Sequence, residues 1–194
     1  LFIQGNFENV NFEFNREFNL QKDKINEIRY DKNLLTGCVN FFDTNFKNII
    51  LKSSDMICED SINIKNSSGI INKIQIDNSY FDALDLDFSK IKINDLKVNN
   101  AQNDCIDFSF GEYEIIDANL KNCGDKGLSV GERSKLNMHN GVIMYSNIGI
   151  ASKDDAITNV KNVAMNNMNI CLAAYNKKKE FKGSKLNIKS LNCN

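Results

Sequence analysis

A five-residue phrase recurs along the chain at a constant interval of 22 residues. It reads Asp60-Ser61-Ile62-Asn63-Ile64 in its first copy and Asp82-Ala83-Leu84-Asp85-Leu86 in its second. The six copies begin at Asp60, Asp82, Asp104, Lys126, Ile148 and Ile170. A constant period of this length is typical of a solenoid, because each repeat forms one coil that buries its apolar face only against neighbouring coils.

Apolar residues recur at three places in each repeat. The third position of the phrase is always Ile or Leu, and the second is always small. Since alternate residues of a strand point to opposite faces, we expect positions three and five to face a core and positions two, four and six to face outward. The three columns are Ile62, Leu84, Ile106, Leu128, Ile150 and Leu172; Ile76, Val98, Leu120, Val142, Ala164 and Leu186; and Ile49, Ile71, Ile93, Ile115 and Phe181. This pattern predicts a three-sided coil of short parallel strands rather than a helical solenoid.

Asparagine forms a further column at the same interval. Asn78, Asn100, Asn122 and Asn166 share it, and Met144 interrupts it. Stacked Asn side chains hydrogen-bond from coil to coil and tolerate the left-handed backbone of a sharp turn. The column therefore predicts a turn ladder, and the alternative is a simple compositional bias toward Asn.

Four segments carry a resemblance to a known superfamily: DALDLDFS at 82–89, NDCIDFSFG at 103–111, GDKGLSVGE at 124–132 and IGIASKD at 148–154. They resemble the right-handed parallel β-helix superfamily, which includes pectate lyases, polygalacturonases, alginate epimerases, phage tailspikes and NosD-type repeat proteins. They are similar in particular to β-helix regions of bacterial proteins from surface-polysaccharide or CotH-like contexts. The resemblance implies an all-β fold, a right-handed single-stranded parallel β-helix of about seven coils, and a polysaccharide partner.

The two ends of the chain are less regular than its middle. We expect residues 1–48 to form an N-terminal capping segment with a first irregular coil, and residues 49–194 to form the β-helix. The stretch from Leu20 to Lys32 has apolar spacing for a short helix or forms an excursion between coils. Because the chain begins at Leu1 rather than Met, we also expect a preceding part and further domains of a longer protein.

Composition and charge exclude some classes of partner. A formal net charge of −1 argues against a nucleic-acid binder, because no basic excess is available to neutralise phosphates. No apolar run approaches the roughly 18 residues of a membrane span. An extracellular or cell-surface location is favoured over a cytoplasmic one.

Outward positions of the phrase form a polar stripe that suits an extended glycan. Asp85 and Asp107 occupy one column on adjacent coils, so their carboxylates are expected about 5 Å apart and repel by roughly 3 kcal/mol. A proton held through a raised pKa, a Ca²⁺ ion held by Asp85, Asp87 and Asp107, or neutralisation by Lys126 would relieve this repulsion. Asp82 and Asp104 form a parallel column that caps backbone N–H groups at the turn.

The stripe supplies candidates for each functional role. Asp85, Asp107 and Lys153 are the candidate catalytic residues, although Lys153 is expected about 10 Å from Asp107 and too far for direct cooperation. The candidate substrate-binding residues are Asp87, Ser109, Ser129, Lys126 and Tyr175. An enzyme of this kind would be a polysaccharide lyase or a glycoside hydrolase, with Ca²⁺ as the one cofactor considered. The alternative is a non-catalytic structural or protein-interaction module, or a purely structural role for the acidic residues.

Six cysteines match no zinc-binding spacing. Cys105, Cys171 and Cys193 share the small-residue column, so a bridge between Cys171 and Cys193 on adjacent coils is conceivable. We expect a ladder of small buried thiols, with one or two disulfides as the alternative if the protein is exported.

Overall fold

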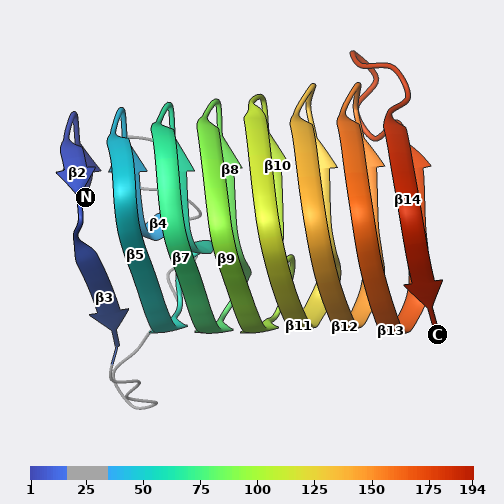
Figure 1. Cartoon of the computed structure of the whole chain (residues 1–194), viewed down its shortest axis with the longest axis horizontal. Helices are drawn as coiled ribbons and strands as arrows, with labels where there is room; N and C mark the ends of the chain where they lie inside the picture. The colour runs from blue at the N-terminus through green and yellow to red at the C-terminus, as the bar shows by residue number, and fades with distance from the viewer. Residues whose placement is uncertain (17–34) are drawn as a thin grey trace.

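The structure is a computed structural model that describes residues 1–16 and 35–194 as stacked parallel strands (Figure 1). The predicted helix or excursion at 20–32 falls outside these residues. In Figure 1 the long strands in front run downward while successive coils advance to the right toward the C-terminus, so the winding is right-handed. The predicted fold class, an all-β parallel solenoid, is confirmed, and the solenoid has roughly six turns. Within the described ranges, no helix has the length and apolarity needed to span a membrane.

Each coil contains one short and one long strand. The short strands are β4 (Gly37–Phe42), β6 (Asp60–Lys65), β8 (Asp82–Asp87) and β10 (Ile106–Ser109). The long strands are β5 (Asn45–Met56), β7 (Ser68–Ser79) and β9 (Lys90–Ala101). From β11 (Glu112–Gly131) onward each long strand continues into the next short segment, as in β12 (Lys135–Lys153) and β13 (Ile157–Tyr175), and β14 (Lys185–Cys193) ends the stack. The N-terminal strands β1 (Phe2–Ile3), β2 (Asn6–Glu8) and β3 (Asn11–Asn15) pair in parallel with β4 and β5.

The recurring phrase sets the register between coils. Leu84 pairs with Ile62 on one side and Ile106 on the other, and the column continues through Leu128, Ile150 and Leu172. Leu84, Ile106 and Leu128 are completely buried. The first predicted column is therefore confirmed as the core of the solenoid.

The second and third predicted columns are wrong in the C-terminal half, where the long strands shift by one residue. Leu120 pairs with Ile143 and then Met165, so Val142 and Ala164 do not continue the column and Leu186 pairs with Thr158. The third column passes from Ile115 to Met138, Val160 and Ile188, while Phe181 lies outside the strands. The cause is the turn after β11's phrase segment, where Glu132 and Arg133 both adopt a left-handed backbone. A compensating irregularity between Cys123 and Lys126 restores the phrase.

The same shift changes the asparagine ladder. Asn122 donates to Asn100, Asn100 to Asn78 and Asn78 to Asp55, at 2.6, 2.9 and 2.9 Å, and the three Asn residues have a left-handed backbone. The turn ladder is thus confirmed for these coils. Its next members are the left-handed Tyr145 and Asn167, rather than Met144 and Asn166.

The small second position of the phrase faces inward, which corrects the prediction that it faces outward. Ser61, Ala83 and Cys105 are buried, because the strand starts at a corner where it meets the end of the long strand of its own coil. Ser61 Oγ lies 2.6 Å from Ser79 Oγ at this corner, and Cys105 is bonded to Cys123 at the equivalent corner two coils later.

All six cysteines are paired in disulfides, so the predicted thiol ladder is wrong. The bridges are Cys38–Cys58, Cys105–Cys123 and Cys171–Cys193. The bridge between Cys171 and Cys193 was the alternative suggested by their places on adjacent coils. Disulfides of this density are typical of proteins that fold in an oxidising compartment.

Aromatic side chains cap the N-terminal end of the solenoid. Phe2 stacks on Phe41 with ring centroids 4.7 Å apart, and Phe7, Phe12 and Phe14 pack around them. Phe41 is completely buried as a result. These contacts cover the core of the first coil.

The shared corner geometry leads to a prediction. Ala83 and Ala101 sit one coil before Cys105 and Cys123, with Ala101 in register with Cys123. We expect the double variant Ala83→Cys/Ala101→Cys to close a fourth disulfide and to raise stability by up to about 3 kcal/mol. Intact mass after alkylation of the folded protein measures this, with the two single variants as controls. Two alkylated thiols in the double variant would contradict the assigned corner.

Candidate functional site

Acidic side chains gather on the outward side of three consecutive short strands. We call Asp60, Asp82, Asp85, Asp87, Asp104 and Asp107 the acidic stripe; they belong to β6, β8, β10 and the segment that leads into β10. Asp85 pairs in register with Asp107, as predicted, and Asp87 pairs with Ser109. In-register stacking therefore places carboxyl groups against one another from coil to coil.

Asn63 relieves part of the crowding on one side of Asp85. Its side-chain amide donates to Asp85 Oδ2 at 3.0 Å and to Asp87 Oδ2 at 3.4 Å. Asn63 is buried, and its own Oδ1 has no hydrogen-bond partner. The amide thus ties two carboxyl groups of one coil to the preceding coil.

Lys153 corrects the expectation that it lies too far from Asp107 to cooperate with it. Its side chain extends back over Gly131, where a Cβ atom would lie 2.7 Å from Lys153 Cε. Lys153 Nζ donates to Ser129 Oγ at 2.7 Å and lies 3.5 Å from Asp107 Oδ1. Only 5% of the Lys153 side chain is exposed. The absence of a side chain at Gly131 allows this reach, which a backbone-to-backbone estimate does not include.

Lys126 does not neutralise Asp85 or Asp107, in contrast to one of the predicted alternatives. Its ammonium group forms ion pairs with Asp104, at 3.3 Å, and with Asp125. The predicted capping role of Asp82 and Asp104 is confirmed. The backbone N–H of Asp104 donates to Asp82 Oδ1 at 2.8 Å, and the backbone N–H of Lys126 donates to Asp104 Oδ1 at 3.0 Å. Lys126 is therefore committed to the turn.

Burial raises the pKa of several of these carboxyl groups. Desolvation, with a further contribution from Asp104, raises the pKa of Asp82 to about 7. Burial also raises the pKa of Asp85 well above its usual value, and the charges of Asp60 and Asp87 add to this. The pKa of Asp60 is raised for the same first reason. These raised pKa values agree with the prediction that a bound proton relieves the repulsion between the carboxylates.

The carboxyl groups that come closest together differ from the predicted metal set. Oxygen atoms of Asp82, Asp104 and Asp107 lie within 4.8 Å of one another. Asp107 is common to both sets, whereas Asp85 and Asp87 are held by Asn63 instead. Two of the three grouped residues already accept backbone hydrogen bonds, so they have structural partners within the turn.

The other predicted binding residues lie at the C-terminal side of the stripe. Ser109 Oγ donates to Glu132 Oε2 at 2.7 Å, and Glu132 Oε1 lies 2.5 Å from Lys178 Nζ. Tyr175 is half-buried and pairs in register with Lys153. Glu132 was not predicted as a site residue, and its place directly after the phrase of its coil is the signal that could have indicated it.

Two phenylalanine side chains, Phe88 and Phe110, lie beside the acidic stripe, and we call this pair the aromatic edge. Phe88 and Phe110 directly follow Asp87 and Ser109, and their rings stack with centroids 4.7 Å apart and planes at 8°. Phe88 is 52% exposed. Both residues have a left-handed backbone, at φ of 48° and 46°. Bulky side chains are rare in this region, and the equivalent turns of two preceding coils use Asp43 and Asn66 instead.

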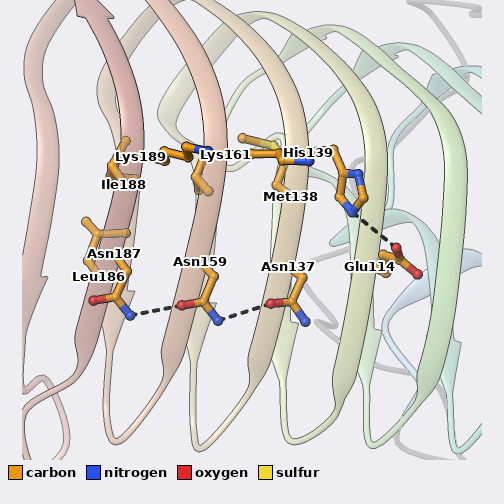
Figure 2. A pocket seen from close by; sticks show the side chains of 11 residues that line it. Glu114, Asn137, Met138, His139, Asn159, Lys161, Leu186, Asn187, Ile188 and Lys189 are labelled. Atoms are coloured by element: carbon orange, nitrogen blue, oxygen red, sulfur yellow. Dashed lines mark hydrogen bonds and ion pairs between the residues drawn. The ribbon is translucent and has the colours of Figure 1, made fainter.

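One hollow on the described surface lies away from the acidic stripe. It has a volume of about 940 Å³ and lies on the long segments of β11 to β14 (Figure 2). None of the predicted site residues lines it.

No known protein family matches the chain, and neither a curated protein nor a solved structure matches it. The resemblance to pectate-lyase-like and NosD-type repeats is therefore supported for the parallel β-helix fold alone. Any chemistry must be argued from the acidic stripe itself.

The raised pKa values lead to a prediction about stability. The folded protein binds protons that the unfolded chain releases between about pH 4 and pH 7, so stability falls as pH rises through this range. For Asp82 alone the loss is on the order of 4 kcal/mol over the whole range and about 3 kcal/mol between pH 5 and pH 8, at about 1.4 kcal/mol for each tenfold change in proton affinity. Chemical denaturation at pH 5 and pH 8 measures the difference.

The variant Asp82→Asn isolates this contribution. We expect it to lose less stability between pH 5 and pH 8 than the wild type, whereas the control Asp95→Asn on a long strand keeps the wild-type slope. A wild type that is more stable at pH 8 than at pH 5 would show that the carboxyl groups are solvated and ionised.

Proposed function

We propose that the acidic stripe binds an extended polysaccharide and hydrolyses its glycosidic bonds. The observation that carries this proposal is the contrast between two carboxyl groups in one column. Burial raises the pKa of Asp85, whereas Asp107 is ion-paired with Lys153 at 3.5 Å. Pairs of carboxyl groups in different protonation states are the usual requirement of glycoside hydrolysis.

The proposed roles follow from these environments. Protonated Asp85 gives its proton to the glycosidic oxygen as the bond to the sugar carbon breaks. Asp107 attacks that carbon and forms a covalent glycosyl ester, which the spacing of about 5 Å between register neighbours allows. Asp85 then takes a proton from the water that hydrolyses the ester, and this restores both groups. Lys153 holds Asp107 in place, and Ser129 orients Lys153. A lyase is less consistent with this geometry, because a buried, ion-paired Lys153 is not a free base.

The surroundings support a neutral or amino-sugar polymer as the substrate class. Lys126 and Lys153 are both ion-paired within the protein, so the stripe offers few cations to a polyuronate and would repel it. The Phe88–Phe110 stack gives the apolar face of a sugar ring a flat surface beside the carboxyl groups. Three disulfides support the proposal of an exported protein.

A non-catalytic module is the second candidate. The capping bonds from Asp82 and Asp104 to backbone N–H groups favour it, because they give part of the stripe a purely structural task. In that case the acidic column would stabilise turns at the cost of mutual repulsion and would have no substrate.

The double variant Asp85→Asn/Asp107→Asn distinguishes the two candidates. We expect the wild type to release reducing ends from cellohexaose or chitosan hexamer, and the variant to lose at least about a hundredfold of this activity while it stays folded. Asp95→Asn/Asp117→Asn is a matched control, since these residues are also register partners on adjacent coils. A wild type that neither binds nor cleaves these oligosaccharides would favour the structural module.

The aromatic edge is tested separately by Phe88→Asn/Phe110→Asn, which installs the residue type that this turn prefers. Relief of backbone strain and loss of ring stacking are both on the order of 1 kcal/mol, so we expect stability to change by less than about 2 kcal/mol. We expect affinity for the same oligosaccharides to fall about tenfold. Unchanged affinity together with a large loss of stability would assign the rings a structural role only.

A further inference from the structure

The hollow on the long strands contains two parallel rows of polar side chains, with one member of each row on each coil. Asn137 pairs in register with Asn159, which pairs with Asn187. His139, Lys161 and Lys189 lie two residues further along the same strands and form the second row (Figure 2). Coils repeat at about 4.8 Å, so each row presents a polar group at that interval.

The asparagine row presents donors to the hollow. Asn187 Nδ2 donates to Asn159 Oδ1 at 2.9 Å, and Asn159 Nδ2 donates to Asn137 Oδ1 at 3.0 Å. Each of these bonds uses one of the two N–H groups of the amide and occupies the carbonyl oxygen of the next residue. What remains in the row is at least one N–H group per coil, whereas two of its three carbonyl oxygens already have a partner.

The second row carries positive charge that the described residues do not neutralise. His139 lies 3.2 Å from Glu114, which is the only acidic residue that lines the hollow. Lys161 and Lys189 are exposed, and neither has an ion-pair partner among residues 1–16 and 35–194. The floor is apolar, with half-buried Leu186 and Ile188. Two cations, a row of donors and an apolar floor together favour an anionic ligand of some length.

We infer that this hollow binds an acidic glycan, whose carboxylate or sulfate groups contact Lys161, Lys189 and the asparagine amides. The glycan runs across the coils, because both rows run in that direction. A nucleic acid fits the hollow less well, since no Phe, Tyr or Trp lines it to stack with bases. This site is independent of the acidic stripe, which lies on the short strands and carries the opposite charge.

The experiment measures binding of fluorescently labelled dextran sulfate to the full chain, with neutral dextran of equal length and oligothymidylate as comparisons. We expect dextran sulfate to bind, with an affinity that falls as salt is raised, and neutral dextran not to bind. Tight binding of neutral dextran, tighter binding of oligothymidylate, or no binding of dextran sulfate would each overturn the inference. Sedimentation in the absence of glycan must also show a monomer, since salt-sensitive self-association would assign the basic row to a second copy.

Variants of the second row locate the site. We expect Lys161→Gln/Lys189→Gln to weaken dextran sulfate binding about tenfold, which corresponds to about 1.4 kcal/mol, and Lys161→Arg/Lys189→Arg to retain it. The control Lys177→Gln/Lys179→Gln removes the same charge from an exposed segment between β13 and β14 and should leave binding unchanged. Equal losses in the control and the test variant would show that only net charge matters, and the inference would be rejected.

Discussion

Parallel stacking of coils in register is the constraint on which the rest of this structure depends. Each backbone strand hydrogen-bonds to its equivalent in the next coil, so every side chain faces a side chain from the same place in the repeat. For Leu84 and Ile106 this produces a continuous core. For Asn78 and Asn100 it produces a hydrogen-bonded ladder. The same geometry is unfavourable for carboxylates, which repel when they are stacked.

The acidic stripe shows how the protein accommodates that unfavourable case. Asn63 bridges two carboxyl groups, Lys153 reaches across Gly131 to a third, and burial shifts the remaining proton equilibria. Immediately beside the stripe, Phe88 and Phe110 occupy a backbone conformation that suits Asn or Asp. Buried carboxyl groups and bulky residues with a left-handed backbone thus lie next to one another in two coils. Both are unfavourable locally, and such features are found more often at functional sites than elsewhere.

The repeat made the fold predictable because the phrase keeps its interval through its six copies. The interval alone did not reveal that the turn at Glu132 and Arg133 contains an additional left-handed residue, and this displaced the expected columns after Leu120. The Cys105–Cys123 bridge was missed because its two residues belong to different columns of one coil.

The sites were less predictable than the fold, because side-chain reach and burial are not periodic. The alignment of Asp85 with Asp107 followed from the repeat. The contact of Lys153 with Asp107 depends on the missing side chain at Gly131, which the pattern treats as an ordinary small residue. The row formed by Asn137, Asn159 and Asn187 was hidden, because the segment before β14 lengthens the step from Asn159 to Asn187 to 28 residues.

Titration of the aspartate carboxyl carbons by NMR tests the central claim most directly, namely that burial, reinforced by neighbouring charges in the stack, makes these acidic groups hold protons. For Asp82 we expect a pKa of about 7, and for Asp85 a pKa well above the ordinary range for aspartate. Substitution of Asp104 by Asn should lower the pKa of Asp82, because it removes a neighbouring charge. Ordinary aspartate values for both residues would contradict the account, since they would mean that water separates the stacked carboxyl groups.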